Sequence, residues 1–130
     1  MFAGTAQEIE TQIAAMAKSG VHGMIILNDT FFVEQLRHIA AQALRNKLPS
    51  IIAIREYAAA GGLMSYGANL TDNFRRAATY VDKILKGAKA GTLPFQSPTR
   101  YYLEINGKTA KALGLTIPRT VLISTEKVIE

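Results

Sequence analysis

Apolar residues at helical spacing alternate with short apolar runs in the first half of the chain. The sequence Thr5-Ala6-Gln7-Glu8 has the form of a capping box, and the apolar residues after it predict a helix that ends at Gly20. A second helix is predicted after Asp29 and Thr30, because either side chain can cap its first turn. The apolar stripe of this second helix consists of Phe32, Leu36, Ile39, Ala40, Ala43 and Leu44.

Two apolar runs, at residues 21–27 and 50–54, predict strands. Residues 24–27 are expected to be the buried part of the first strand, and the second is expected to lie buried in a parallel sheet. Helix, strand, helix and strand therefore follow one another with short connections. This order predicts an α/β fold with a parallel, Rossmann-like sheet and right-handed crossovers.

The second half of the chain begins after Gly61-Gly62 with a short apolar segment, residues 63–66, that predicts another strand. Residues 69–86 predict the clearest helix of the chain, and Gly87 suits the position just after its C-terminus. One face of this helix carries Leu70, Phe74, Ala77, Ala78, Val81, Ile84 and Leu85.

Weaker patterns follow this helix. Residues 88–99 predict a loop, residues 100–105 a strand, and residues 108–113 a short helix. The residues expected to share the apolar face of that strand are Tyr101, Leu103 and Ile105. From Pro118 onward the pattern indicates a helical turn and then a short strand at residues 128–129.

Composition is that of an ordinary globular domain. The 130 residues, 48% of them hydrophobic and 19% charged, are enough for one domain with its own core. The absence of cysteine excludes disulfides, thiolate metal sites and a cysteine nucleophile. The net charge of +5 comes from basic residues that are scattered and not interleaved with aromatic residues. A solvated surface is therefore expected, and no nucleic-acid partner.

Targeting signals are not visible in the sequence. No apolar run approaches the roughly 20 residues of a membrane span. Residues 1–10 have neither the basic region nor the apolar region of a signal peptide. If Met1 is the true start of the protein, the expected compartment is the cytoplasm.

Polar side chains directly follow the two predicted strands of the first half. Asn28, Asp29 and Thr30 follow the first strand, and Arg55 and Glu56 follow the second. Ligands collect beyond the carboxyl ends of strands in open α/β sheets, so these loops are candidate ligand contacts. Arg55 and a helix N-terminus would suit the carboxylate of a small zwitterion, and Asp29 or Glu56 its ammonium group. The structural alternative is that Asp29 and Thr30 only cap the helix, while Arg55 pairs with Glu56.

Two aromatic residues are further candidates for ligand binding. Tyr66 precedes a glycine, and a tyrosine there can supply contact area and one hydrogen bond to a ligand. Its alternative role is that of a core tyrosine bonded to the backbone. Phe31 lies off the apolar stripe and is a candidate for the same cleft, whereas Phe32 lies on the stripe and is expected in the core.

No catalytic, metal or cofactor site is predicted. His22 and His38 do not have the spacing of metal ligands. Ser65 lacks the G-x-S-x-G context of a nucleophile, and no histidine is placed to serve it. The glycines of residues 61–67 match neither the dinucleotide-binding pattern nor the P-loop. We therefore expect neither an enzyme nor a bound cofactor.

Two long segments carry a family resemblance. Residues 55–70, REYAAAGGLMSYGANL, and residues 74–118, FRRAATYVDKILKGAKAGTLPFQSPTRYYLEINGKTAKALGLTIP, closely resemble the C-terminal part of ABC-transporter substrate-binding proteins. The subfamily it is similar to contains the uncharacterised and tryptophan/tyrosine-type periplasmic components. The resemblance runs from about residue 5 to the end of the chain. It covers only the last part of such a protein.

The resemblance implies a fold of the type I periplasmic-binding-protein kind, in which two lobes close by a hinge around a ligand. On that plan, residues 1–60 belong to the second lobe. Residues 61–92 supply the hinge at Gly61-Gly62 and a strand and helix of the first lobe. Residues 93–130 supply the return crossing and the C-terminal portion of the second lobe. The fold would then be incomplete, with most of the first lobe absent.

The same resemblance implies a solute-binding component of an ABC-type importer, or a truncated fragment of one. Its ligand would be a small organic solute, with an amino acid as the expected class, its partner an ABC permease, and its compartment the periplasm. One alternative is a folded remnant or dimeric interaction domain without a ligand. Another is the ligand-sensing domain of a transcription regulator, which requires a DNA-binding helix-turn-helix that is not seen in this sequence.

The helix at residues 69–86 has a strongly apolar face but, on this plan, no partner layer. An exposed face of that kind is unstable in a monomer. We expect the chain either to fold back into a compact α/β domain or to form a homodimer that covers the face. Exchange of segments across Gly61-Gly62 is one route to such a dimer.

Overall fold

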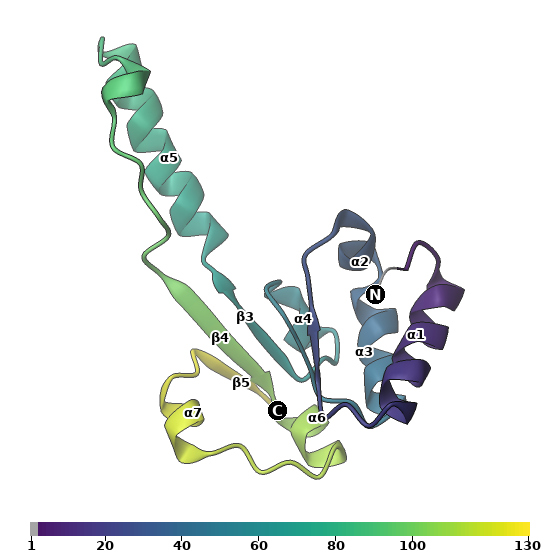
Figure 1. Cartoon of the computed structure of the whole chain (residues 1–130). Helices are drawn as coiled ribbons and strands as arrows, with labels where there is room; N and C mark the ends of the chain where they lie inside the picture. Colours follow the sequence, from purple (N-terminus) through teal and green to yellow (C-terminus); the bar gives the residue numbers. More distant parts are fainter. Residues whose placement is uncertain (1–2) are drawn as a thin grey trace. The chain divides into compact units, whose positions relative to one another are not determined.

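The structure, a computed structural model, describes residues 3–130. In chain order its elements are α1 (Ala6–Lys18), β1 (Met24–Ile26), α2 (Thr30–Glu34), α3 (Leu36–Arg45), β2 (Ser50–Ile52), α4 (Glu56–Ala59), β3 (Met64–Ala68), α5 (Leu70–Leu85), the 3-10 helix η1 (Ala90–Thr92), β4 (Tyr101–Asn106), α6 (Gly107–Ala112), α7 (Arg119–Ile123) and β5 (Lys127–Ile129). The predicted helices and strands occur in the expected order, and two short helices, α4 and η1, were not predicted (Figure 1).

The strands form one five-stranded sheet in the order β1-β2-β3-β4-β5. Strands β1, β2 and β3 are parallel to one another, and β4 is parallel to β5. Backbone bonds from Asn106 to Leu63 and from Asn69 to Arg100 show that β4 runs antiparallel to β3, because the residue numbers change in opposite directions. The prediction of an α/β fold with a mainly parallel sheet is confirmed.

The chain divides into two compact units, which we describe separately. The large unit contains the residues up to Gly67 together with Tyr102–Glu130, and the small unit contains Ala68–Tyr101. Gly61-Gly62, the predicted hinge, therefore lies inside the large unit. Gly61 has a φ of 106°, and its carbonyl accepts a hydrogen bond from the Thr109 hydroxyl at 2.9 Å. The assignment of the units to lobes stays a prediction.

The core of the large unit lies on one face of the sheet. The strand register places Ile26, Ile52 and Ser65 side by side on that face, and all three are buried. Helices α1 and α3 pack over it with their apolar stripes, as the helical spacing predicts. The buried members of this cluster are Ile9, Ile13, Ile26, Leu36, Ile39, Ala40, Leu48, Ile52 and Tyr57.

The opposite face of the sheet is not covered in the same way. Ile25 and Leu27 expose 79% and 78% of their surface, so the prediction that residues 24–27 are buried is wrong for these two. The reason is geometric: successive side chains of a strand point to opposite faces, and α1 and α3 cover only the face of Ile26. Tyr66 is exposed on the same side as Ile25.

The predicted single helix after Asp29 is divided in two. α2 ends at Glu34, and Gln35 separates it from α3, which begins at Leu36. Leu36, Ile39, Ala40 and Ala43 are buried as the stripe predicts, but Phe32 and Leu44 are only half-buried. The change of direction at Gln35 takes Phe32 out of line with the α3 stripe, because the two helices have separate axes.

The small unit consists of α5, η1 and the segment that returns to β4. Asn69 caps α5 by accepting a hydrogen bond from the Asp72 amide, and Gly87 follows it with a φ of 99°. The Arg76 guanidinium donates to Gln96, Ser97 and Thr99 of the return segment, which lies alongside α5 (Figure 1). None of the residues of α5 is buried, and Phe74 exposes 73% of its surface. The small unit thus leaves the apolar face of its helix exposed, as predicted.

Candidate functional site

The predicted site residues lie at one edge of the large unit's sheet. β1, β2 and β3 are parallel, so their carboxyl ends meet at the same edge. Asn28 follows β1, Arg55 and Glu56 follow β2, and Tyr66 lies within β3. The structure brings these residues to one edge, but their side chains divide among three surroundings.

The loop after β1 begins helix α2. The Asp29 carboxylate accepts a hydrogen bond from the Phe31 amide at 2.9 Å and caps the helix, and Thr30 is its exposed first residue. Phe31 is half-buried, packs against the helix-covered core and lies 5.9 Å from the Phe32 ring between centroids. Asp29 therefore has the helix-capping role that was considered as its structural alternative.

Arg55 is the centre of an ion cluster that the sequence did not reveal. Its Nε donates to Glu104 at 2.6 Å and its terminal nitrogen to Glu126 at 2.6 Å, so its partners are these carboxylates and not Glu56. The guanidinium also lies 5.1 Å from the centroid of the Tyr102 ring. The hydrogen bonds with Glu104 and then Glu126 raise the pKa of Arg55 above its usual range.

This cluster changes the electrostatics predicted for the edge. One guanidinium with two carboxylates carries a net charge of −1, and Glu104 is 5% exposed. The cluster as a whole therefore disfavours the carboxylate of a zwitterion. The alternation of Tyr101, Leu103 and Ile105 predicted one apolar face for β4, and Ile105 is buried as expected, whereas Tyr101 is exposed. Tyr102 and Glu104, on the face that β4 shares with Ser65, are buried as well, which the alternation did not indicate.

Contacts of Ser65 and Gly67 with neighbouring backbone hold the carboxyl edge of the sheet in place. The Ser65 hydroxyl accepts from the Ala58 amide at 2.9 Å and donates to the Arg55 carbonyl at 3.2 Å, which fixes α4 against β3. A side chain at Gly67 would place its Cβ 2.8 Å from the Ala53 carbonyl oxygen, so only glycine fits there. Ser65, rejected as a nucleophile, thus has a structural role beside the candidate site.

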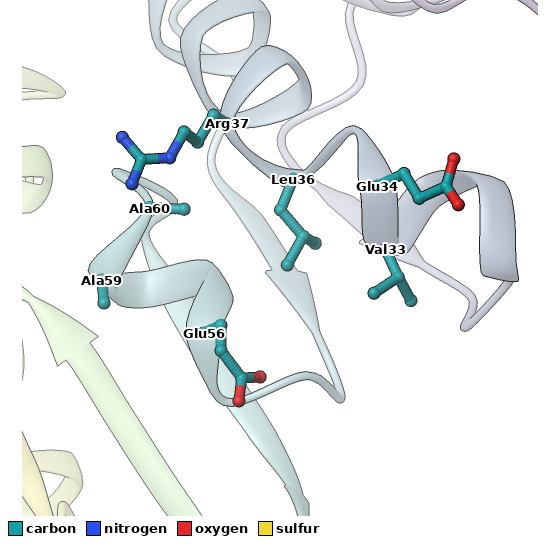
Figure 2. A pocket seen from close by; sticks show the side chains of 7 residues that line it. All are labelled: Val33, Glu34, Leu36, Arg37, Glu56, Ala59 and Ala60. Carbon is teal, nitrogen blue, oxygen red and sulfur yellow. The ribbon is translucent and has the colours of Figure 1, made fainter.

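A shallow groove of about 350 Å³ is lined by residues of α2, the start of α3 and α4. Its lining residues are Val33, Glu34, Leu36, Arg37, Glu56, Ala59 and Ala60. Figure 2 shows that the Glu34 and Arg37 side chains point away from each other, with Leu36 between them. The charged groups therefore do not converge on one small solute. Of the predicted site residues, this groove contains Glu56.

A second groove, of about 470 Å³, lies on the exposed face of the sheet and is called the sheet groove below. Its lining residues are Ile25, Ile26, Leu27, Asn28, Ile51, Ile52, Ala53 and Tyr66. It joins two of the predicted residues, Asn28 and Tyr66, to an otherwise apolar surface. An amide and an aromatic ring beside apolar side chains are typical of pockets for small organic ligands. The continuous apolar run of residues 24–27 gave no signal for this groove, since it does not distinguish Ile25 and Leu27 from Ile26.

Other kinds of site are not found in the part of the chain that the structure describes. No group of three or more His, Asp or Glu side chains among residues 3–130 is arranged to hold a metal ion. None of the helices in this range combines the length and hydrophobicity that a transmembrane span requires.

Comparison with known proteins gives a consistent result. Residues 1–129 match the family model described as ABC transporter substrate binding protein. Among curated protein sequences, none matches the chain. A solved conserved domain protein from Vibrio cholerae is similar with 26% identity and a TM-score of 0.82, over 97% of this chain and 42% of that one.

Two further solved structures have a similar fold. An ABC domain from Streptococcus pneumonia in complex with L-Trp has 25% identity and a TM-score of 0.80, over 98% of this chain and 44% of that one. A ligand-free, open substrate binding protein with adhesive properties from Clostridium difficile has 20% identity and a TM-score of 0.74, over 98% of this chain and 42% of that one. The periplasmic-binding-protein-like fold is thus confirmed. The chain spans less than half the length of these structures, as the predicted incompleteness requires.

Proposed function

The chain belongs to the ABC transporter substrate binding protein family, and from this premise we propose that its large unit binds a small organic solute in the sheet groove. The observation that carries the proposal is that Asn28 and Tyr66, at the carboxyl edge of the parallel strands, line one apolar groove. The solute class we propose is an amino acid with an apolar or aromatic side chain.

The composition of the groove supports this solute class. Its volume of about 470 Å³ lies within the usual range of small-molecule pockets, and none of its lining residues is charged. An aromatic side chain would lie on Ile25, Leu27 and Ala53, beside the Tyr66 ring. The L-Trp bound by the protein from Streptococcus pneumonia is a solute of this kind, which is why we choose it as the probe.

The polar end of the solute is assigned to the loop after β1. The Asn28 amide can donate to the carboxylate, and the Asp29 carboxylate can attract the ammonium group while it caps α2. We propose that the surrounding residues make smaller contributions to solute binding. These are Thr30, Phe31, Arg55 and Glu56. Arg55 is expected to contribute little to binding, because Glu104 and Glu126 already bind its guanidinium and give the cluster a net charge of −1.

The wider role that we propose is that of a solute-binding component of an ABC-type importer. Its partner would be an ABC permease, its compartment the periplasm, and its activity binding without catalysis. These proposals derive from family membership, and the chain spans less than half of the similar structures. The binding step alone can be tested on this chain.

The test is a thermal melt of the chain with L-tryptophan, and with L-lysine as the control amino acid. L-tryptophan at ten times its dissociation constant should add about 1.4 kcal/mol to the free energy of unfolding, and L-lysine should add nothing measurable. Tyr66→Ala should weaken L-tryptophan binding about tenfold or more, since one stacking face and its area are lost. Tyr80→Ala, in the small unit, is the matched control and should leave the affinity unchanged. A chain whose melting temperature responds to neither amino acid would refute the proposal.

A further inference from the structure

Tyr102 is a buried residue of β4 whose side chain reaches across β3 to the end of β2. The backbone bonds between β3 and β4 place Tyr102 directly opposite Gly67. Opposite residues point to the same face of a sheet, and Gly67 has no side chain to fill the space beside the ring. The Tyr102 hydroxyl therefore extends over Gly67 and donates to the Ala53 carbonyl at 3.2 Å.

Gly67 leaves the room that this hydrogen bond needs. A Cβ at position 67 would lie 2.8 Å from the Ala53 carbonyl oxygen and 3.0 Å from the Tyr102 hydroxyl oxygen. The glycine thus allows the backbone of β3 to lie directly against both partners of the bond. Burial, and then the nearby Glu56 carboxylate, raise the pKa of Tyr102, so the hydroxyl keeps at neutral pH the proton that it donates.

The ion cluster of Arg55 holds the Tyr102 ring in its position. The Arg55 guanidinium lies 5.1 Å from the ring centroid and is bonded to Glu104 and Glu126, both at 2.6 Å. Glu104 lies two residues after Tyr102 in β4 and reaches across β3 on the same face. β4 therefore contacts the segment after β2 at two points, the Ala53 carbonyl and the Arg55 side chain.

These contacts lie where the pairing of β2 with β3 has ended. The last paired residues are Ile52 and Ser65. Ala53 and Tyr66, one residue further along each strand, both line the sheet groove. Because they lie beyond the last pair, the register of the two strands does not fix the distance between them. The bond from Tyr102 fixes the position of Ala53 instead.

We propose that Tyr102 is a positioning residue for solute binding, because its hydroxyl holds Ala53 at the distance from Tyr66 that the side chain of the solute fills. This inference rests on the proposed function and adds to it a residue that does not line the groove. Tyr102 is 5% exposed and lies on the buried face of the sheet with Ser65, whereas Tyr66 is exposed. Tyr102 therefore acts through Ala53 and not by contact with the solute.

Calorimetric titration of the folded chain with L-tryptophan, well below the melting temperature, tests the inference. Tyr102→Phe keeps the ring and removes only the hydroxyl, so it should weaken binding about fivefold, the effect of one lost hydrogen bond. Gly67→Ala pushes against the same carbonyl from β3 and should weaken binding about tenfold or more. Circular dichroism checks that both variants fold. A merely structural role of Tyr102 would lower the melting temperature and leave the dissociation constant of the folded chain unchanged.

Tyr80→Phe is the matched control. The Tyr80 hydroxyl donates to the Pro94 carbonyl at 2.6 Å in the small unit, so this variant loses the same kind of bond. Its dissociation constant for L-tryptophan should equal that of the wild type. The ¹³C chemical shift of the Ala53 carbonyl is a second measurement, and it should change in Tyr102→Phe but not in Tyr80→Phe.

The outcomes separate the inference from the proposed function. A wild-type chain that does not bind L-tryptophan would refute the proposed function, and the inference with it. If the wild type binds L-tryptophan and Tyr102→Phe binds it equally well, the inference alone is overturned and the proposed function stands. Weaker binding by Tyr102→Phe, with a changed Ala53 shift and an unaffected Tyr80→Phe, would support both.

Discussion

Helices α3 and α5 have the same kind of amphipathic sequence and opposite surroundings. α3, in the large unit, buries Leu36, Ile39, Ala40 and Ala43 against the sheet. α5, in the small unit, buries none of its residues, although its apolar stripe is longer. The comparison shows that periodicity identifies which face of a helix favours burial. Whether that face is buried depends on whether another layer is present to cover it.

The largest effect should be the difference in stability between two variants, each of which loses one large side chain, one in each unit. Tyr57 is fully buried and Phe74 is largely exposed. Tyr57→Ala should lower the free energy of unfolding by about 3–5 kcal/mol, because it leaves a cavity beneath the helices. Phe74→Ala should change it by less than about 0.5 kcal/mol. Urea unfolding of both variants at one low protein concentration measures both.

Hydrogen exchange tests the same contrast between the large and the small unit. Amides of α3 should be protected and those of α5 should exchange faster, because α5 has no buried side chain. Equal costs for Tyr57→Ala and Phe74→Ala would mean that the α5 stripe is covered within one chain. The contrast between the units would then be wrong.

Alkaline pH should weaken the large unit through Tyr57. Burial raises the pKa of its hydroxyl to about 12, and the hydrogen bond with Ser50 opposes this. The unfolded chain loses this proton near pH 10 and the folded chain near pH 12, so stability present below pH 10 is lost as the pH rises through 12. The loss should reach about 1.4 kcal/mol per pH unit, or about 2.7 kcal/mol in all.

Urea unfolding from pH 8 to 12 measures this loss, and Tyr57→Phe is the control because it has no hydroxyl to titrate. The difference between the two pH profiles isolates Tyr57 from the other groups that titrate in this range. Parallel profiles would show that the Tyr57 hydroxyl has the same pKa in the folded and unfolded chains.

A matched pair of glycines should give the smallest effect. A Cβ at Gly62 would lie 2.1 Å from Cε1 of the buried Tyr57, whereas one at Gly91 in the small unit meets nothing within 4 Å. Gly62→Ala should cost about 1–3 kcal/mol, because the Tyr57 ring is fully enclosed and bonded to Ser50. Gly91→Ala should stay within about 0.5 kcal/mol. Thermal melts of both variants compare them, and a neutral Gly62→Ala would mean that the ring can move aside.

Much of the candidate site was visible in the sequence because the loops after strands can be identified from local pattern. Asn28, Arg55, Glu56 and Tyr66 all lie at the expected edge of the sheet. Their surroundings were not visible. The predicted alternative partner of Arg55 was its neighbour Glu56, but its actual partners are 49 and 71 residues away in the chain.

The sequence by itself determined what depends on neighbours within about one helical turn. The caps at Thr5 and Asp29, the turn at Gly87 and the apolar stripes of α3 and α5 match the predictions. The tertiary structure alone decided which face of β1 is covered, which carboxylates neutralise Arg55 and which stripe stays open. These depend on the layers that pack against each element, and packing joins residues whose separation along the chain leaves no periodic signal.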